Sequence, residues 1–183
     1  MGPVTKERLR QHFKGKLQEL RASGNQHLEG SLKIQQQIIS VLEKYPGTWG
    51  AFSPLASEPQ IRWQELSRPL AFPRVEDSQL CFYLDEPREK SSFGVLEPNS
   101  NFEYRIPMER MVGIFVPGLG FDRQGHRLGR GQAFYDRSLR DFKKLKIGIC
   151  FSCQLMEEFP QAAVDRWDVE MNAILTESES VWK

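Results

Sequence analysis

A glycine- and arginine-rich stretch, residues 116–139, carries the side chains best suited to chemistry. It reads VPGLGFDRQGHRLGRGQAFYDRSL. Glycines let backbone N–H groups approach an anion closely, and the forked donors of arginine match pairs of phosphate oxygens. Asp136 offers an oxygen ligand for Mg²⁺, which usually binds through one or two carboxylates together with substrate phosphates. The stretch therefore predicts a phosphate-binding loop, with a long surface loop of solvated arginines as the alternative.

The segments on either side of this loop predict how it is positioned. Residues 111–116 (MVGIFV) form a short apolar run typical of a buried strand. From residue 132 the apolar residues recur three to four apart, as on one face of a helix, and residues 146–152 (KIGICFS) return to a strand-like run. The order strand, loop, helix, strand predicts a parallel crossover unit, with the loop at the carboxyl end of its first strand. The loop matches neither the G-x-x-x-x-G-K-[ST] phosphate loop nor a dinucleotide fingerprint.

The rest of the chain predicts further helices and strands. Thr5 is a suitable N-cap for a helix that ends near Ser23, and a second helix is expected from about Gly30 to Tyr45. Lys6 and Arg10 lie four apart and so share one face of the first helix. A short strand is expected at 49–52, a brief helix at 60–67, and two adjacent strands at 69–75 and 79–85 with a turn between them.

Composition excludes several classes of protein. The 183 residues are 39% hydrophobic and 27% charged with a net charge of +1, so a general nucleic-acid binder is not expected. No apolar run is long enough to span a membrane, and the first residues lack the apolar core of a signal peptide. Cys150 and Cys153 have C-x-x-C spacing, but no second pair or nearby histidine completes a zinc site, so we expect structural cysteines. We expect a cytoplasmic protein and, for its assembly, a monomer.

The segment PGLGFDRQGHRLGRGQAFYDR resembles the signature of the 5-formyltetrahydrofolate cyclo-ligase family, PG-x-AFD-x-x-G-x-RLG-x-G-x-GYYDR. Two further segments are similar to the family: KERLR to the K-x-x-x-R of its first helix, and DRWDVEMNAILTES to its closing [HW]-D-x-x-x-D-x-I-x-T-E. FGVLEP resembles the F-G-I-x-E-P loop near the pterin, to which we assign no residue role. The resemblance implies an α/β fold, a single three-layer α/β/α domain over residues 1–183 with a mostly parallel, Rossmann-like sheet.

The same resemblance implies an enzyme, an ATP- and Mg²⁺-dependent ligase that closes 5-formyltetrahydrofolate to 5,10-methenyltetrahydrofolate and releases ADP and phosphate. The catalytic residues implied are Arg127, Arg130 and Tyr135, and the metal ligands are Asp136 and Asp168. Glu58, Phe52 and Ser53 are implied as folate contacts. The residues implied to bind ATP are Lys6, Arg10, Arg127, Leu128, Gly129, Arg130, Gly131, Gln132, Ala133, Phe134 and Tyr135.

Gln132 and Ala133 depart from the family pattern, which usually has Gly or Lys and then Gly at these positions. Alanine is strained there if the position needs a positive φ, and harmless if the position is already helical. The departure leaves open a second interpretation, a catalytically impaired protein of the same fold that binds a nucleotide or phospho-metabolite. A phosphosugar isomerase on a related architecture is a third, although no carboxylate base is evident for it.

Overall fold

The computed structural model describes residues 5–165 and 167–183. Its centre is the expected crossover unit: β7 (Gly113–Pro117) and β10 (Leu145–Ile149) are parallel neighbours, and α3 (Phe134–Ser138) lies between them in the chain. Only five residues of the expected helix are helical. The three-to-four spacing nevertheless predicted burial correctly, because Leu139 and Phe142 beyond the helix end are in the core.

The main sheet of the described chain has eight strands in the order β13-β12-β10-β7-β1-β2-β3-β6. The strands from β12 to β2 run parallel, whereas β13, β3 and β6 join the edges antiparallel. The sheet is thus mixed and mostly parallel, as expected. The bounds are β1 (Trp49–Gly50), β2 (Leu70–Glu76), β3 (Gln79–Tyr83), β6 (Arg105–Ile106), β12 (Ala173–Leu175) and β13 (Ser180–Trp182). The predicted hairpin is β2–β3, whose turn places Asp77 and Ser78 at positive φ.

Two long helices precede the sheet. In α1 (Lys6–Ala22) the Thr5 hydroxyl accepts from the Arg8 N–H at 3.4 Å, which confirms the predicted N-cap. The second helix, α2 (Asn25–Lys44), begins earlier than expected. The apolar period is weak in its first turns, where His27 is the first buried side chain, so periodicity alone could not find this start.

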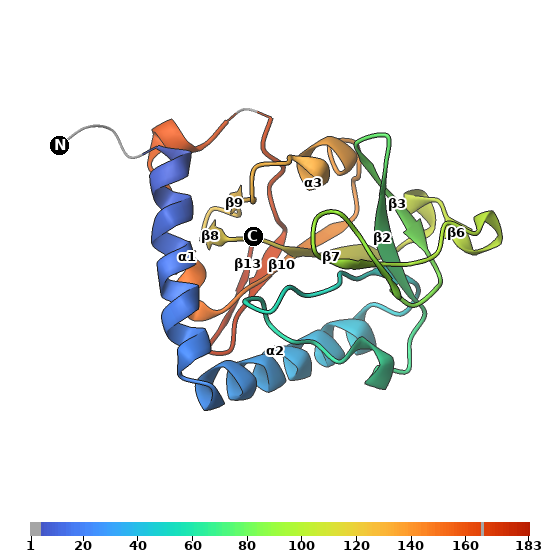
Figure 1. Ribbon diagram of the computed structural model, residues 1–183, viewed down its shortest axis with the longest axis horizontal. Coiled ribbons are helices and arrows are strands. Elements are labelled where there is room, and N and C mark those ends of the chain that lie inside the picture. Colours follow the sequence, from blue (N-terminus) through green and yellow to red (C-terminus); the bar gives the residue numbers. More distant parts are fainter. Residues whose placement is uncertain (1–4, 166) are drawn as a thin grey trace.

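The helices divide between the two faces of the sheet (Figure 1). On one face α2 packs Ile34 and Ile38 against Trp49 and Phe115. On the other, the segment of α3 covers the sheet with a second apolar cluster that includes Ile114, Val116, Phe121, Leu139 and Phe142. Successive residues of β7 alternate between the two clusters, as a strand buried on both faces requires.

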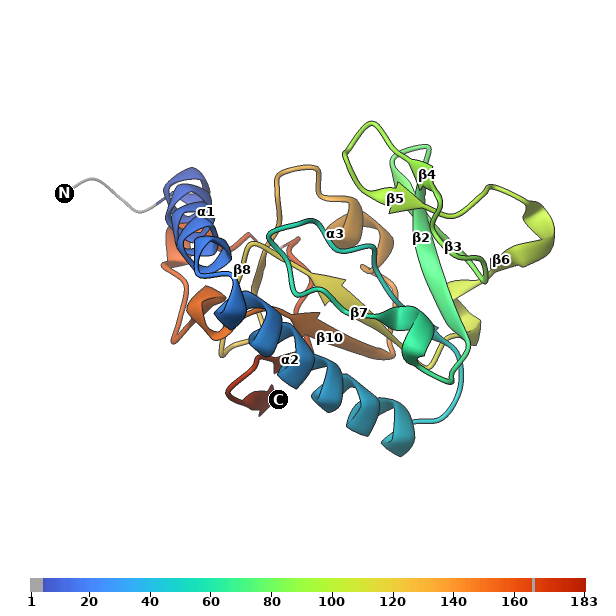
Figure 2. The same ribbon diagram turned by 60° about the horizontal axis from the view of Figure 1, so that its bottom comes forward.

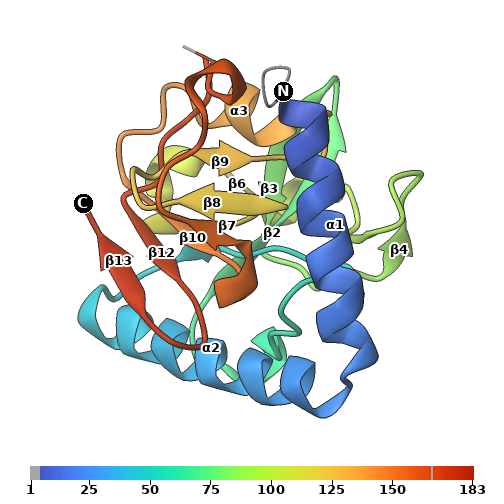
Figure 3. The same cartoon turned by 90° about the vertical axis from the view of Figure 1, so that its left-hand side faces the viewer.

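A smaller sheet, β11-β8-β9, supports α1 (Figure 3). Its strands are β8 (Gly120–Asp122), β9 (Arg127–Leu128) and β11 (Leu155–Met156). Leu9 and Phe13 of α1 pack with Leu128 and Phe159. A Cβ at Gly120 would lie 2.3 Å from the Phe13 ring, so only glycine allows this close approach. The helix therefore sits directly over the predicted phosphate loop.

The remaining elements are short. Strands β4 (Glu89–Lys90) and β5 (Leu96–Glu97) form a hairpin beside β2 (Figure 2). It is held there by Arg74, which bonds the Glu89 carboxylate at 2.6 Å and the Pro98 carbonyl at 2.8 Å.

No helix among the described residues is long and apolar enough to cross a membrane. The 3₁₀ turns are Trp63–Glu65, in the expected brief helix, and Phe102–Tyr104, Met108–Arg110, Ser152–Gln154 and Gln161–Ala163.

Candidate active site

The predicted phosphate loop is partly a β-hairpin, because β8 and β9 pair across residues 122–126. The buried Asp122 carboxylate holds this turn. It accepts from the backbone N–H groups of Gln124 (3.0 Å), His126 (2.9 Å) and Phe159 (2.8 Å), and it faces His126 Nδ1 at 2.9 Å. A carboxylate with this many donors is rigidly placed. Arg127, the next residue after the turn, is therefore fixed in position.

Arg127 forms a buried ion pair with Asp136. Its Nη2 lies 2.9 Å from Asp136 Oδ2, and the two side chains are 5% and 17% exposed. Nη1 donates to the Pro117 carbonyl at 3.3 Å, and the guanidinium lies 5.3 Å from the Tyr135 ring centroid. Arg127 Nε is buried and has no hydrogen-bond partner within the described chain. One strong donor thus remains for a ligand oxygen.

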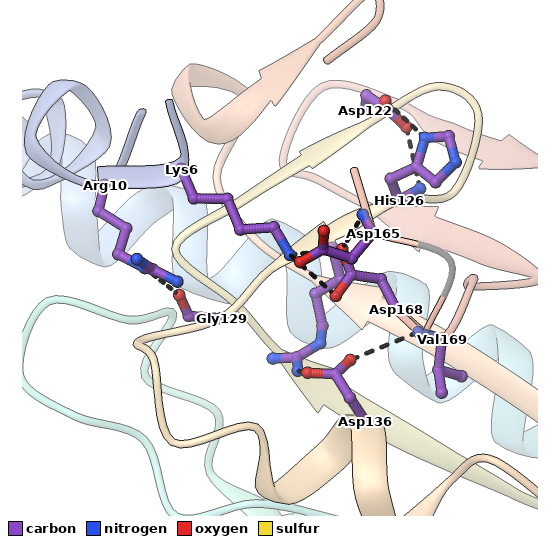
Figure 4. A network of polar contacts seen from close by, with 10 residues as sticks. Lys6, Arg10, Asp122, His126, Gly129, Asp136, Asp165, Asp168 and Val169 are labelled. Atoms are coloured by element: carbon purple, nitrogen blue, oxygen red, sulfur yellow. Dashed lines mark hydrogen bonds and ion pairs between the residues drawn. The ribbon is translucent and has the colours of Figure 1, made fainter. Parts of the chain in front are cut away.

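Lys6, the first residue of α1, reaches the other end of the described chain (Figure 4). Its Nζ lies 2.7 Å from Asp165 Oδ2 and 2.7 Å from Asp168 Oδ2. Partial burial by itself would lower the pKa of Lys6, but hydrogen bonds and charges from the two aspartates outweigh it and raise the pKa. The neighbouring Val169 N–H donates to Asp136 Oδ1 at 3.4 Å, which brings the segments of both predicted metal ligands together.

Arg10 and Arg130 hold the two ends of the glycine-rich turn. Arg10 Nε donates to the Gly129 carbonyl at 3.1 Å, also drawn in Figure 4. Arg130 pairs with the buried Glu58, with 2.9 Å between Nη2 and Oε1. Glu58 Oε2 in turn accepts from the Leu55 N–H at 2.9 Å. The turn between residues 129 and 131 is thereby tied to α1 on one side and to the segment after β1 on the other.

Two cavities adjoin at this loop. The polar cavity, of about 600 Å³, lies between α1, the loop and the segment after residue 164. Basic side chains outnumber acidic ones among its described lining residues: Lys6, Arg10, Arg127, Arg137, Arg140, Asp136, Asp165 and Asp168. Such a lining suits a polyanion, because guanidinium and ammonium groups bind phosphate oxygens.

The apolar cavity, of about 170 Å³, lies on the other side of the loop, against β2 and the β4–β5 hairpin. Its described lining is dominated by apolar side chains, among them Phe52, Pro73, Val75, Leu80, Phe93, Leu96 and Phe134. Arg127, Gly129 and Ala133 line both cavities. A group bound in one cavity can therefore meet a group bound in the other at Arg127.

Each predicted site residue lines one of these cavities. The apolar cavity has the predicted folate contacts Phe52, Ser53 and Glu58, and also Arg130, Gln132, Phe134 and Tyr135, which were expected to bind the nucleotide. The polar cavity has Lys6, Arg10, Leu128, Gly131, Asp136 and Asp168, and the three shared residues belong to both. The sequence thus predicted residues that line both cavities, but it did not predict which residue lines which cavity.

The conformation of Ala133 shows whether alanine is strained or harmless at this position. Its φ and ψ are 53° and 21°, in the left-handed region, directly before α3. An L-residue costs about 1 kcal/mol or more there, so the alanine is strained rather than helical. Nearby Gly131 has φ 110°, where a side chain is rarely accommodated.

Tyr135 is placed as a hydrogen-bond donor rather than as a base. Burial raises the pKa of its phenol well above the ordinary value, and the neighbouring Arg127 lowers it too little to compensate. The hydroxyl therefore keeps its proton at neutral pH.

Two acidic residues of the site were missed from the sequence. Asp165 shares Lys6 with Asp168, and its only sequence signal was its position three residues before that aspartate. Glu97 lies in β5 on the wall of the apolar cavity, 7% exposed. Its signal was an acidic residue within the apolar segment FGVLEP. Among the described residues no three acidic, histidine or cysteine side chains cluster as a metal site, so a cation would also need ligand oxygens from a bound phosphate.

The fold and the paired cavities define an α/β protein in which a cavity rich in basic side chains adjoins an apolar cavity. The 5-formyltetrahydrofolate cyclo-ligase family model matches residues 57–177. This chain belongs to that family.

Individual cyclo-ligases are also similar to this chain in sequence. The chain is 34% identical over 99 residues to a 5-formyltetrahydrofolate cyclo-ligase of Haemophilus influenzae, covering 52% of this chain and 51% of that protein. A match to the Escherichia coli K12 cyclo-ligase likewise covers 47% of that protein, so the chain spans about half the length of these two relatives. The mouse cyclo-ligase is 26% identical over 199 residues, covering 94% of this chain and 93% of the mouse protein.

Solved structures show the same fold. The Mycoplasma pneumoniae 5,10-methenyltetrahydrofolate synthetase superposes with a TM-score of 0.72 at 23% identity, covering 94% of this chain and 98% of that one. The synthetase of Aquifex aeolicus superposes with a TM-score of 0.74 at 26% identity, covering 97% and 92%. The mostly parallel eight-stranded sheet is therefore the fold of these synthetases.

Proposed function

We propose that this chain is an ATP- and Mg²⁺-dependent 5-formyltetrahydrofolate cyclo-ligase. The observation that carries the proposal is the shared wall of the two cavities, which Arg127, Gly129 and Ala133 line from both sides. A phosphoryl transfer between two substrates needs their reacting atoms in contact and water excluded. Membership in the family and the cyclo-ligases among its relatives support the same activity.

The polar cavity suits the triphosphate of ATP. Lys6, Arg10 and Arg127 present cations to it from α1 and β9. Each cation has a carboxylate within ion-pair distance: Asp165 and Asp168 for Lys6, Glu7 for Arg10, and Asp136 for Arg127. Magnesium–ATP brings both a cation and an anion, so it can exchange partners with such pairs without leaving a charge unpaired.

Asp136 and Asp168 are the candidate magnesium ligands. Both line the polar cavity, and carboxylate oxygens are the donors that Mg²⁺ prefers. With these two carboxylates as ligands, the remaining coordination positions are left for phosphate oxygens and water. The donor set therefore fits the ion, which would neutralise charge on the transferred phosphoryl group when bound.

The apolar cavity suits the flat ring system of the folate. Phe52, Phe93 and Phe134 supply faces and edges for stacking, and the Glu58–Arg130 pair offers hydrogen bonds beside them. The unpaired Nε of Arg127 is a donor for an oxygen at the meeting point of the two substrates. Arg127 thus touches the reacting atoms, while Glu58 and Arg130 orient the folate.

The proposed reaction starts when the formyl oxygen of 5-formyltetrahydrofolate attacks the γ-phosphorus of ATP, and ADP leaves. The N10 amine then attacks the activated formyl carbon and gives up its proton. Phosphate departs with the former formyl oxygen, which leaves the 5,10-methenyl ring. Protein groups position the substrates and neutralise charge, and no covalent intermediate with the enzyme is needed.

The test is the absorbance of the methenyl product, followed with purified protein, 5-formyltetrahydrofolate and Mg²⁺, with and without ATP. We expect an increase that requires ATP. The strained Ala133 favours the second candidate, an impaired nucleotide-binding protein of the same fold. That candidate predicts no increase in absorbance, while ATP still protects the protein against thermal unfolding.

A further inference from the structure

The wall of the apolar cavity formed by the β4–β5 hairpin has an acceptor oxygen to spare. Glu97 of β5 is 7% exposed and lines the cavity. Its Oε1 accepts a long hydrogen bond, 3.4 Å, from the Val75 N–H of β2. Within the described chain, Oε2 accepts no hydrogen bond. Oε2 is not fully enclosed by the described residues, so a ligand in the cavity that supplies donors can pair with it.

Glu58, the other carboxylate of this cavity, is already satisfied. Its Oε1 pairs with the Arg130 guanidinium, and its Oε2 accepts from the Leu55 N–H. The cation near Glu97 is Arg74, whose hydrogen bonds go to Glu89 and to the Pro98 carbonyl. Arg74 therefore attracts the Glu97 charge without occupying its oxygens, and Glu97 is the carboxylate of this cavity that remains open to a ligand.

The position of Glu97 relative to Arg127 determines which part of a folate it would meet. Arg127 lies where the apolar cavity adjoins the polar one, on the side of α1, whereas β5 lies beyond α3 from α1 (Figure 2). In a reduced folate, N5 and the 2-amino group lie on opposite sides of the bicyclic ring. With the N5 formyl group at Arg127, the pyrimidine edge points toward the hairpin.

We propose that Glu97 recognises the pyrimidine edge of the bound folate by accepting hydrogen bonds from the N3–H and the 2-amino group. This inference rests on the proposed function, because it assumes a folate in the apolar cavity. The two donors lie side by side, in the arrangement that a carboxylate accepts in pairs. Glu97 is thus a specificity-determining residue that selects a 2-amino-4-oxopyrimidine and orients N5 toward the phosphates.

The test compares Glu97→Gln with Glu86→Gln by calorimetric titration with 5-formyltetrahydrofolate in the absence of ATP. Glutamine keeps the size of the side chain but places an N–H₂ group against the ligand's donors. We expect Glu97→Gln to raise the Kd about tenfold or more. Glu86→Gln should stay within about twofold of wild type, because Glu86 lies just before the same hairpin, pairs within the described chain only with the exposed Arg88, and does not line the cavity.

A second ligand identifies the contact itself. The 2-desamino-2-methyl analogue of 5-formyltetrahydrofolate lacks one of the two donors. Wild type should bind it about tenfold more weakly than the parent, whereas Glu97→Gln should show a clearly smaller difference, since glutamine has one acceptor oxygen in place of two. Equal parent affinity in wild type and Glu97→Gln would overturn the proposal. So would equal losses in both glutamine variants, or an undiminished preference for the parent in Glu97→Gln.

The binding measurement separates this inference from the proposed activity. A wild-type protein that binds 5-formyltetrahydrofolate with the expected Glu97 dependence but forms no methenyl product would overturn the cyclo-ligase reaction and support the contact. A protein that turns over normally with glutamine at position 97 would overturn the contact alone. If wild type binds no folate, both are wrong.

Discussion

Arg127 and Asp136 form their ion pair across the boundary between the β8–β9 hairpin and α3, with 2.9 Å between Nη2 and Oδ2. Both side chains are largely shielded from solvent, at 5% and 17% exposure. A pair in this setting has two effects: it joins the phosphate loop to the helix that follows, and it holds a charged donor at the wall between the cavities. Loss of the ion pair should therefore lower the stability of the fold and the rate of turnover for two different reasons.

Replacing Arg127 with alanine should abolish most turnover and also destabilise the fold. Asp136 would lose its partner in a mostly buried site, a change that costs about 3 kcal/mol or more. The measurements are the steady-state rate of methenyl formation and the free energy of unfolding in urea.

The double variant Arg127→Ala/Asp136→Ala separates the two effects. Because no unpaired charge remains, it should recover a large part of the lost stability while turnover stays low. Stability that falls further in the double variant would contradict the pairing argument. Wild-type turnover in Arg127→Ala would remove this arginine from the reaction.

Asp168→Asn should raise the Mg²⁺ concentration needed for half-maximal activity by about tenfold, because an amide is a neutral and weaker ligand for a hard cation. Asp165→Asn is the matched control. Asp165 shares Lys6 with Asp168 at the same 2.7 Å distance, but its side chain is 61% exposed. When Mg²⁺ is titrated at a fixed ATP concentration, the curve of activity against Mg²⁺ concentration should be shifted for Asp168→Asn alone. Equal shifts in both variants would point to the Lys6 pairing rather than to the metal.

Ala133→Gly should leave the protein equally stable or up to about 1 kcal/mol more stable, because it removes the left-handed strain of an L-residue at φ 53°. Gly131→Ala, two residues earlier, should do the opposite, since φ 110° strains any side chain there. Thermal unfolding of both variants tests the signs. A loss of stability in Ala133→Gly would show that the entropy of the unfolded glycine outweighs the strain.

The protein should lose stability below about pH 6.5 through His27. Burial, then the nearby Arg21, lowers the pKa of this histidine below its ordinary 6.5, so the folded state holds it neutral. Below pH 6.5 the unfolded chain binds the proton that the folded state resists, and the free energy of unfolding falls as the pH decreases. Urea denaturation at pH 7.5 and 5.5 should show a smaller difference for His27→Gln than for wild type. An unchanged difference would assign the acid sensitivity to other groups.

The central fold followed from short-range signals in the sequence. The apolar runs at β7 and β10 and the glycines between them predicted a parallel crossover with a loop at the strand ends, because strands buried on both faces are apolar throughout. The start of α2 did not follow, since its first turns are mostly exposed and carry no apolar period. The β8–β9 hairpin was also missed: its strands are short, and the Asp122 hydrogen bonds that hold its turn include one to Phe159, far along the chain.

The site was predicted as a list of residues rather than as a geometry. Lys6 and Asp168 were each assigned from separate segments, and nothing in either segment indicated that they meet. The division of the loop between two cavities depends on the direction in which each side chain points from the turn at 129–133, which only tertiary packing sets. Glu97 was left without a role because its burial comes from β2, which lies next to it only in the fold.

The Lys6 ion pairs also determine when the polar cavity can form. Its partners lie 159 and 162 residues further along the chain. On the ribosome, α1 emerges well before the segment with Asp165 and Asp168, so the polar cavity stays open until that segment has been synthesised and has folded back onto α1. Closing contacts of such long sequence separation is slow. The nascent chain can therefore fold much of its sheet before the polar cavity is complete, so under the proposed function nucleotide binding would begin late in synthesis.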